Sequence, residues 1–243
     1  MLGKGSHTND WELRYSLRSF FLNYQCQSQA WVIGHCPAWL DTSMVRHIDW
    51  PDPYQVNKDA NLLNKAIRLA FERELSERFI FCSDDHFLIR ASGREDFLHW
   101  HCGEIPLSTT EDKNSWHQRL VTTGRKLRQA GYSALNFEGH VPYPVEKAWL
   151  AGALRFDYGA GAGMTLFSTI LNCAQVEAAH INSQRIRGWL GGPLTSEQIA
   201  SKLATNQFAC STNDLTLPGL MPQIEALFPE PCPWEIDQVL NRG

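Results

Sequence analysis

The chain has 243 residues, of which 43% are hydrophobic, 11% aromatic and 20% charged, so its composition is that of a globular protein rather than a disordered or fibrous one. Its formal net charge of -4 argues against a surface that binds nucleic acid over its whole area, although a local basic patch is compatible with it. The length suits one large α/β domain, and we expect residues 1–243 to form a single domain.

The seven cysteines include no Cys-x-x-Cys pair, which argues against a disulfide framework and against a zinc ribbon. Their number and spacing indicate a reducing, cytoplasmic setting. No apolar run approaches the roughly 20 residues that a membrane span requires, so we expect any membrane association to be peripheral.

The first part of the chain alternates helical and strand-like patterns. Apolar residues recur at helical spacing over residues 12–21 and, most clearly, over residues 61–75. Short apolar runs at residues 30–34 and 45–50 are typical of strands. Helices that alternate with short buried strands predict a mostly parallel sheet flanked by helices.

A third strand-like run, residues 79–82, leads into two adjacent carboxylates, Asp84 and Asp85. Burying one unpaired carboxylate costs on the order of several kcal/mol, and two neighbouring ones also repel each other. A divalent cation such as Mg²⁺ or Mn²⁺ would offset both costs, and ligands bind at the carboxyl ends of parallel strands. The alternative is a plain turn, in which both acids cap the next segment. For an isolated Asp-Asp pair we favour the turn.

The second half of the chain contains two basic or histidine-rich segments. His99, His101 and Cys102 are potential metal ligands, but their alternation is more typical of one face of an exposed strand. The predicted helix at residues 116–131 carries several arginines, which form either a solvated face or a patch that binds phosphate or acceptor.

His140 lies in a short loop between Gly139 and two prolines. Such a loop presents its side chain rigidly, as a general base or a substrate ligand requires, although a structural turn has the same composition. Further along, Thr195 and Gln198 are spaced as a capping box at the start of a helix, and the predicted strand at residues 208–214 ends in polar side chains.

Six motifs occur in an order that resembles Stealth-type sugar-phosphate transferases and related bacteriophage glycosyltransferases. They lie at residues 12–19, 37–40, 75–87, 140–142, 211–214 and 228–235. The resemblance spans nearly the whole chain and implies a GT-A-like nucleotide-sugar fold. It also implies a bacterial or phage-infected host cell as the setting.

The resemblance implies a role for several individual residues. Asp84 and Asp85 match the metal-binding acids, which would hold Mn²⁺ or Mg²⁺. The residues that match catalytic positions are His140, Asp85 and Asp214. The residues assigned to the nucleotide-sugar donor are Gly3, Gly5, Ser6, Arg14, Arg18, Asn61, Arg155 and Asn213. Arg14 and Arg18 lie four residues apart on one helix face, where they could bind donor phosphates or pack their stems against the sheet.

Two departures from the family pattern affect the expected fold. The chain has only the loop-like residues 2–6 where family members begin with a strand, so either a weakened nucleotide pocket or an empty sheet position is expected. Residues 160–163 are a glycine- and alanine-rich run where relatives tend to be charged.

The resemblance predicts transfer of a sugar or sugar phosphate to a hydroxyl of a glycan, a protein such as a virion component, or a modified DNA base. A cation on the acids would stabilise the departing diphosphate, and His140 would accept the acceptor's proton. The alternative is a catalytically inactive module of the same fold that binds carbohydrate or DNA. The sequence does not specify the oligomeric state.

Overall fold

The computed structural model describes residues 10–55, 57–108, 116–181, 190, 194–210 and 217–236. The helices are α1 Trp11–Asn23, α2 Lys58–Ala70, α3 Trp116–Gln129, α4 Lys147–Leu150, α5 Leu166–Cys173, α6 Ser196–Thr205 and α7 Leu217–Leu227, with short 3₁₀ turns η2 Arg94–Asp96 and η3 Ala151–Arg155. The strands are β1 Trp31–Ile33, β2 Arg46–Ile48, β3 Arg78–Phe81, β4 His86–Leu88, β5 Trp100–His101, β6 Tyr143–Glu146, β7 Ala179–His180 and β8 Phe208–Cys210.

The protein is a mixed α/β structure whose strands form small sheets. Within the described residues there are four two-stranded sheets, of which β1–β2 and β5–β7 are parallel and β3–β6 and β4–β8 are antiparallel. The expected mostly parallel central sheet, and with it the GT-A-like arrangement, is therefore not confirmed. The physical reason is that the two strands flanking the acid pair, β3 and β4, each take an antiparallel partner from the second half of the chain.

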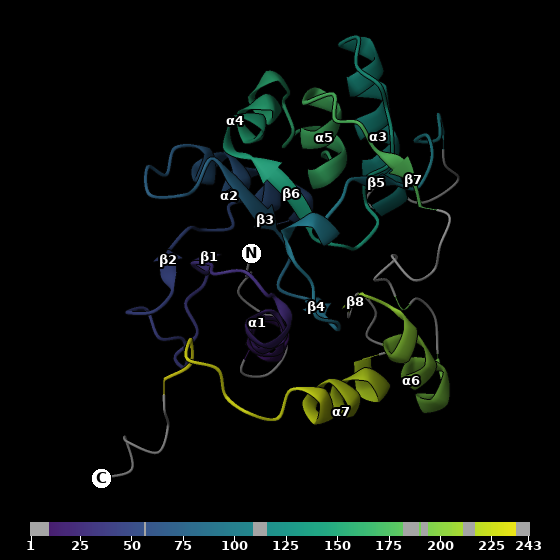
Figure 1. Ribbon diagram of the computed structural model, residues 1–243. Helices are drawn as coiled ribbons and strands as arrows, with labels where there is room; N and C mark the ends of the chain where they lie inside the picture. Colours follow the sequence, from purple (N-terminus) through teal and green to yellow (C-terminus); the bar gives the residue numbers. More distant parts are fainter. Residues whose placement is uncertain are drawn as a thin grey trace.

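The helices form two layers around these strands (Figure 1). Helices α2, α3, α4 and α5 lie on one side of β3 and β6, whereas α6 and α7 lie at the opposite end of the molecule, with α1 between the two groups. The local predictions for α1, α2 and α3 hold to within a few residues. The predicted capping box is confirmed, because the Thr195 hydroxyl accepts from the Gln198 amide and the Gln198 side chain accepts from the Thr195 amide.

Strand β4 joins the two halves of the hydrophobic core. Its Leu88 packs into the cluster formed with α2 and α5, whereas Phe87 packs on the opposite face with residues of α6 and α7. All three residues of β4 are buried. This burial on both faces explains why the sequence after the acid pair is apolar without alternation.

Helix α1 satisfies the backbone of β4 through three polar side chains. The Ser16 hydroxyl donates to the His86 carbonyl at 2.6 Å, and the Ser19 hydroxyl accepts from the Leu88 amide at 2.9 Å. The Asn23 amide donates to the Leu88 carbonyl at 2.7 Å. These residues recur at helical spacing on one face of α1, so the helix takes the place of a neighbouring strand along this edge of β4.

A cavity of about 690 Å³ is lined by every residue of β1 and β3 and by the adjacent face of α1. Within the described residues, β1 pairs only with β2, and β3 pairs only with β6. Each strand therefore has one edge without a described strand partner, and both strands border the same cavity. Asp84 lies at the margin of this cavity.

No helix within the described residues is both long and apolar enough to cross a lipid bilayer. All seven cysteines are free thiols.

Candidate functional site

The acid pair lies in the tight connection between β3 and β4. Phe81, the last residue of β3, is buried, and His86, the first residue of β4, is 1% exposed. Asp84 and Asp85 are partly exposed at the turn between them. The carboxylates therefore lie at a turn after β3, in which only Phe81 is buried, and before β4, which is buried throughout.

Strand β8 brings Cys210 beside this turn. In the antiparallel β4–β8 pair His86 lies directly opposite Cys210, and both side chains are buried. Residues directly opposite each other in an antiparallel pair place their side chains on the same face of the sheet. The pairing therefore fixes an imidazole and a thiol next to each other.

The loop before β6 supplies His140. Its φ of 54° lies in the left-handed region, which is uncommon for a residue with a Cβ and indicates a backbone held by its surroundings. Helix α5 holds this loop, because the Ser168 hydroxyl accepts from the Phe137 amide at 3.0 Å and donates to a Glu138 carboxylate oxygen at 2.9 Å. The same oxygen accepts from the Ser168 amide at 2.9 Å.

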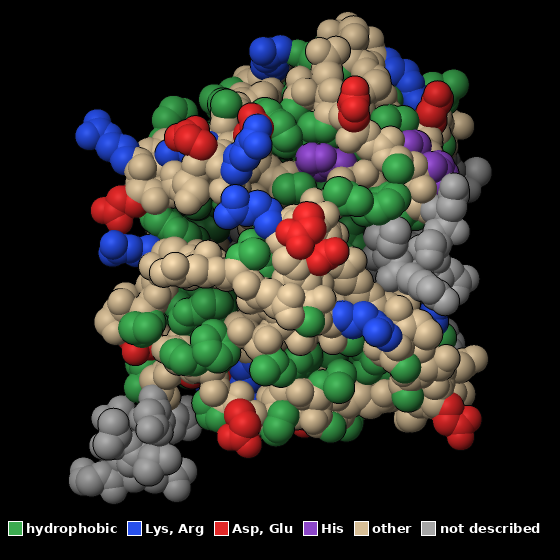
Figure 2. Space-filling view, viewed as in Figure 1, with side chains coloured by type: hydrophobic (Ala, Val, Ile, Leu, Met, Phe, Trp, Pro, Cys, Tyr) green, Lys and Arg blue, Asp and Glu red, His purple; other side chains and the backbone are tan. Residues whose placement is uncertain are grey.

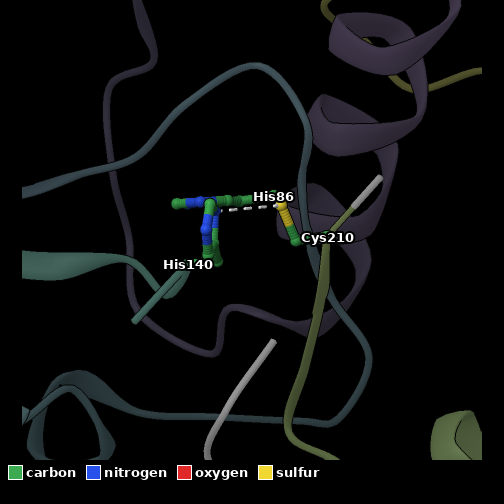
Figure 3. A group of neighbouring side chains, drawn as sticks. All are labelled: His86, His140 and Cys210. Atoms are coloured by element: carbon green, nitrogen blue, oxygen red, sulfur yellow. Dashed lines mark hydrogen bonds between the residues drawn. The ribbon is translucent and has the colours of Figure 1, made fainter. Parts of the chain in front are cut away.

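Figure 3 shows that His86, His140 and Cys210 point toward one another from three separate segments. The Cys210 thiol donates to Oδ2 of Asp85 at 3.0 Å, and its sulfur lies 3.9 Å from Nδ1 of His140. Nε2 of His86 lies 3.9 Å from Oδ1 of Asp85. Two residues predicted to be catalytic, Asp85 and His140, thus lie around the same buried thiol.

Burial sets the ionisation of two groups beside the acid pair. It lowers the pKa of His86 to about 4, against the opposing attraction of Asp85, so this imidazole is neutral near pH 7. Burial likewise raises the pKa of the Cys82 thiol to about 11, with Asp84 and Asp85 adding to the shift. Both groups are therefore uncharged at neutral pH.

The acid pair has the oxygen donors that suit the hard cation implied by the resemblance. Mg²⁺ and Mn²⁺ are often bound by one or two carboxylates, with water and substrate phosphates in the remaining positions. The side chain of Asp85 is 19% exposed, so its carboxylate is accessible to a cation. Among the described residues, no group of three metal-ligating side chains with all donor atoms within 4.8 Å includes either carboxylate. The pair thus has the donor type that such a cation takes, without a third protein ligand among the described residues.

Arg14 and Arg18, which were assigned to the donor phosphates, contact the C-terminal segment of the protein instead. The buried Arg18 guanidinium donates to both carboxylate oxygens of Glu235, at 2.6 and 2.8 Å, and to the carbonyls of Phe228 and Pro229. Arg14 lies 3.4 Å from the same carboxylate and over the ring of Trp39. These arginines attach α1 to the C-terminal segment, which is closer to the packing alternative than to phosphate binding.

Two other residues assigned to the donor also have protein partners. The buried Asn61 side chain accepts from the Tyr54 amide at 2.9 Å and donates to the Tyr54 carbonyl at 2.8 Å. Arg155 is exposed at the end of η3, and its guanidinium contacts the Tyr132 hydroxyl. Among the described residues, neither Asn61 nor Arg155 contacts Asp85 or His140. Gly3, Gly5, Ser6, Asn213 and Asp214 lie outside the described residues.

The basic helix α3 mainly uses its cations within the protein. Arg119 pairs with Asp59, Lys126 donates to the Asp157 carbonyl, and Arg128 donates to the Ile105 carbonyl at 2.6 Å. Positive and negative side chains are also interspersed on the face shown in Figure 2, with no single basic field. These three cations therefore contact the protein itself, which fits neither a fully solvated face nor an open anion patch.

His101 lies in β5, whereas His99 precedes that strand, and both histidines are partly buried rather than on an exposed strand face. Nε2 of His99 donates to the Pro144 carbonyl at 2.7 Å, and the backbone amide of Gly103 donates to Nδ1 of His101 at 3.1 Å. The metal-ligating cluster of the described residues lies elsewhere, at His86, His140 and Cys210.

Sequence reasoning missed Cys210 and Glu138 as parts of the site. Cys210 was only one residue of a predicted strand, and its position opposite His86 depends on strand register. Glu138 lies two residues before His140, and this proximity was the only sequence feature that could have indicated its role. Its hydrogen bonds to Ser168, 30 positions further along the sequence, could not be predicted.

No protein-family model matches the chain, and a search of curated proteins finds no significant match. The fold and the site together define a mixed α/β protein with a partly buried acid, histidine and thiol cluster at the end of two strands.

Proposed function

We propose that this protein is a metal-dependent transferase that moves a sugar or sugar phosphate from a nucleotide-sugar donor to a hydroxyl acceptor. The observation that supports the proposal best is the convergence of Asp85 and His140 on Cys210, from segments 55 residues apart in the sequence (140 − 85). A carboxylate that can hold a cation and a histidine that can move a proton are the two groups that such transfer requires.

Each side chain has a separate task in the proposed reaction. Asp84 and Asp85 would hold the cation, which when bound stabilises the negative charge that develops on the departing diphosphate. His140 would accept the proton of the acceptor hydroxyl, and the anchored loop would keep its ring in place during approach of the substrate. Glu138 and Ser168 act only through that loop, so they are positioning residues.

A non-catalytic module that binds carbohydrate or DNA is the second candidate. The cavity between β1 and β3 favours it, because an incomplete sheet beside Asp84 would leave the donor side of the site incompletely built. Such a module would bind a glycan or DNA but release no nucleotide from any donor.

Substitution of the two converging residues tests the proposal. We expect Asp85→Asn and His140→Gln each to reduce Mn²⁺-dependent turnover of a nucleotide-sugar donor by at least about 100-fold, the size of effect typical for loss of a general base or a key charge. Release of free nucleotide measures turnover, and circular dichroism verifies folding.

Glu197→Gln serves as the matched control, because it removes an exposed carboxylate from the first turn of α6, in a different part of the chain. Its turnover should equal that of the wild type. Full activity of Asp85→Asn in the presence of EDTA would refute the metal role.

A further inference from the structure

We propose that His86, His140 and Cys210, with Asp85 beside them, form a binding site for zinc or a cation of similar softness. This site is distinct in chemistry from the hard-cation position at the acid pair. The inference concerns binding alone and does not depend on the proposed transferase activity.

The spacing of the donor atoms is close to that of a zinc site. The ligand atoms of the three side chains all lie within 4.8 Å of one another. In a tetrahedral site with bonds of about 2.0 Å to nitrogen and 2.3 Å to sulfur, neighbouring ligand atoms are separated by about 3.3–3.6 Å. The separation of 3.9 Å between the Cys210 sulfur and Nδ1 of His140 is already near this range. Small side-chain rotations would therefore close the group around an ion.

Asp85 lies beside the three donors without belonging to the set whose ligand atoms are all mutually close. Its carboxylate is 3.0 Å from the Cys210 sulfur and 3.9 Å from Nε2 of His86. Zinc is usually four-coordinate, with a water molecule able to take the fourth position. Asp85 is therefore placed to accept a hydrogen bond from such a water.

The donor chemistry separates zinc from magnesium and manganese. Two imidazole nitrogens and one thiolate favour a borderline-soft ion, whereas hard ions prefer an all-oxygen set. Without an ion, the Cys210 thiol donates a hydrogen bond to Asp85. When the sulfur bonds to the ion as a thiolate, the thiol proton is released to solvent. No redox step is involved.

The fold limits the cost of binding. His86 and Cys210 are paired across β4 and β8, so their relative position is fixed before the ion arrives. One contact opposes coordination through Nε2 of His86. If Nε2 binds the ion, Nδ1 carries the proton and can no longer accept the hydrogen bond from the Ser83 amide. That contact is 3.4 Å long, beyond the usual range of N–H hydrogen bonds, so its loss costs little.

Zinc would also act on the proposed reaction, and this consequence rests on the proposed function. An ion held by His140 engages the proposed base and lies beside Asp85, one of the proposed metal-binding acids. Zinc is therefore expected to inhibit transfer even in the presence of excess Mn²⁺.

Cobalt(II) is the probe for this site, because it replaces zinc and gives an absorption band in the near ultraviolet when bonded to a thiolate. We expect the reduced full-length protein to bind one equivalent of Co²⁺ with this band, and Zn²⁺ to abolish it. The band should disappear in Cys210→Ser and persist in Cys82→Ser, a control that removes a partly buried thiol outside the group.

X-ray absorption of the zinc-loaded wild type keeps the test independent of how the variants fold. One sulfur ligand with nitrogen and oxygen neighbours agrees with the proposal. Absence of the cobalt band in the wild type, its survival in folded Cys210→Ser, or two sulfur ligands would overturn it. None of these readouts requires turnover, so a failure here and a failure of the transferase proposal are distinguishable.

Discussion

Glu138 is a buried carboxyl group at the base of the loop that carries His140. Its Oε1 accepts from both the amide and the hydroxyl of Ser168, near the N-terminus of α5. Burial nevertheless raises its pKa to about 7, and the nearby charge of Asp59 adds to the shift. The loop of the proposed base is thus attached to the helix through a group that changes charge near neutral pH.

This raised pKa predicts a pH dependence of stability. Glu138 binds its proton more tightly in the folded than in the unfolded state, so its contribution is fully present below pH 4.5, the ordinary value, and is lost as pH rises through about 7. Glu138→Gln should therefore remove part of the decrease in unfolding free energy between these limits. Urea denaturation at a series of pH values, with EDTA present, measures it. An unchanged pH profile in the variant would contradict the assignment.

Asp85 and His140 could be predicted from the sequence, because residue type and local context already indicate their chemistry. Asp84 and Asp85 follow an apolar run, and His140 lies among glycine and prolines. The partners of Arg18 and Asn61 could not be predicted in the same way. Arg18 and Glu235 are 217 positions apart in the sequence, so only the tertiary fold brings them into contact.

At the scale of elements, β4 depends on α1 for hydrogen bonds that a sheet would normally supply. The Leu88 amide is buried and bonds to the Ser19 hydroxyl, which itself donates to the Ser16 carbonyl at 2.7 Å. β4 also carries His86 and follows the acid pair. The position of α1 therefore affects the site directly.

Ser19→Ala should destabilise the protein by about 1–3 kcal/mol, because a buried backbone amide then lacks a partner. Urea denaturation measures the change. Ser201→Ala provides the control, since this exposed serine lies within α6, where alanine is at least as favourable. Equal stability of the two variants would show that the contact between α1 and β4 contributes nothing.

The elements themselves were more predictable than their pairing. Apolar periodicity located α1 and α2, a helix was also predicted where α3 lies, and the Thr195–Gln198 spacing located the start of α6. Local patterns carry no information about strand partners, so the antiparallel pairing of β3 with β6 was not foreseen. The glycine run shows the same limit, because a Cβ on Gly163 would lie 1.8 Å from the side chain of Asn57, a contact between distant segments.

At the scale of the whole molecule, the cavity between β1 and β3 separates two short sheets. Within the described residues, β1 and β3 each have one edge without a strand partner, and both strands line this cavity together with apolar side chains. An extended strand inserted there would join the β1–β2 and β3–β6 pairs into one larger sheet.

A fusion tests this arrangement. A six-residue strand of alternating valine and threonine, joined through a flexible linker to Trp11, should raise Tm by about 2–4 °C for each kcal/mol of stability gained. Hydrogen exchange should also show new protection in β1 and β3. The control carries proline at alternate positions, which removes backbone donors. Equal Tm values for the two fusions, with no new protection, would contradict the prediction.

The central claim is that the Asp85–His140 group performs metal-dependent transfer, and release of nucleotide from a donor tests it most directly. The wild-type protein is incubated with Mn²⁺ and a panel of nucleotide sugars, and free nucleotide is measured with and without EDTA. We predict slow release from at least one donor, abolished by EDTA. Silence across the whole panel, together with binding of the folded protein to a glycan or to DNA, would contradict the account and favour the non-catalytic module.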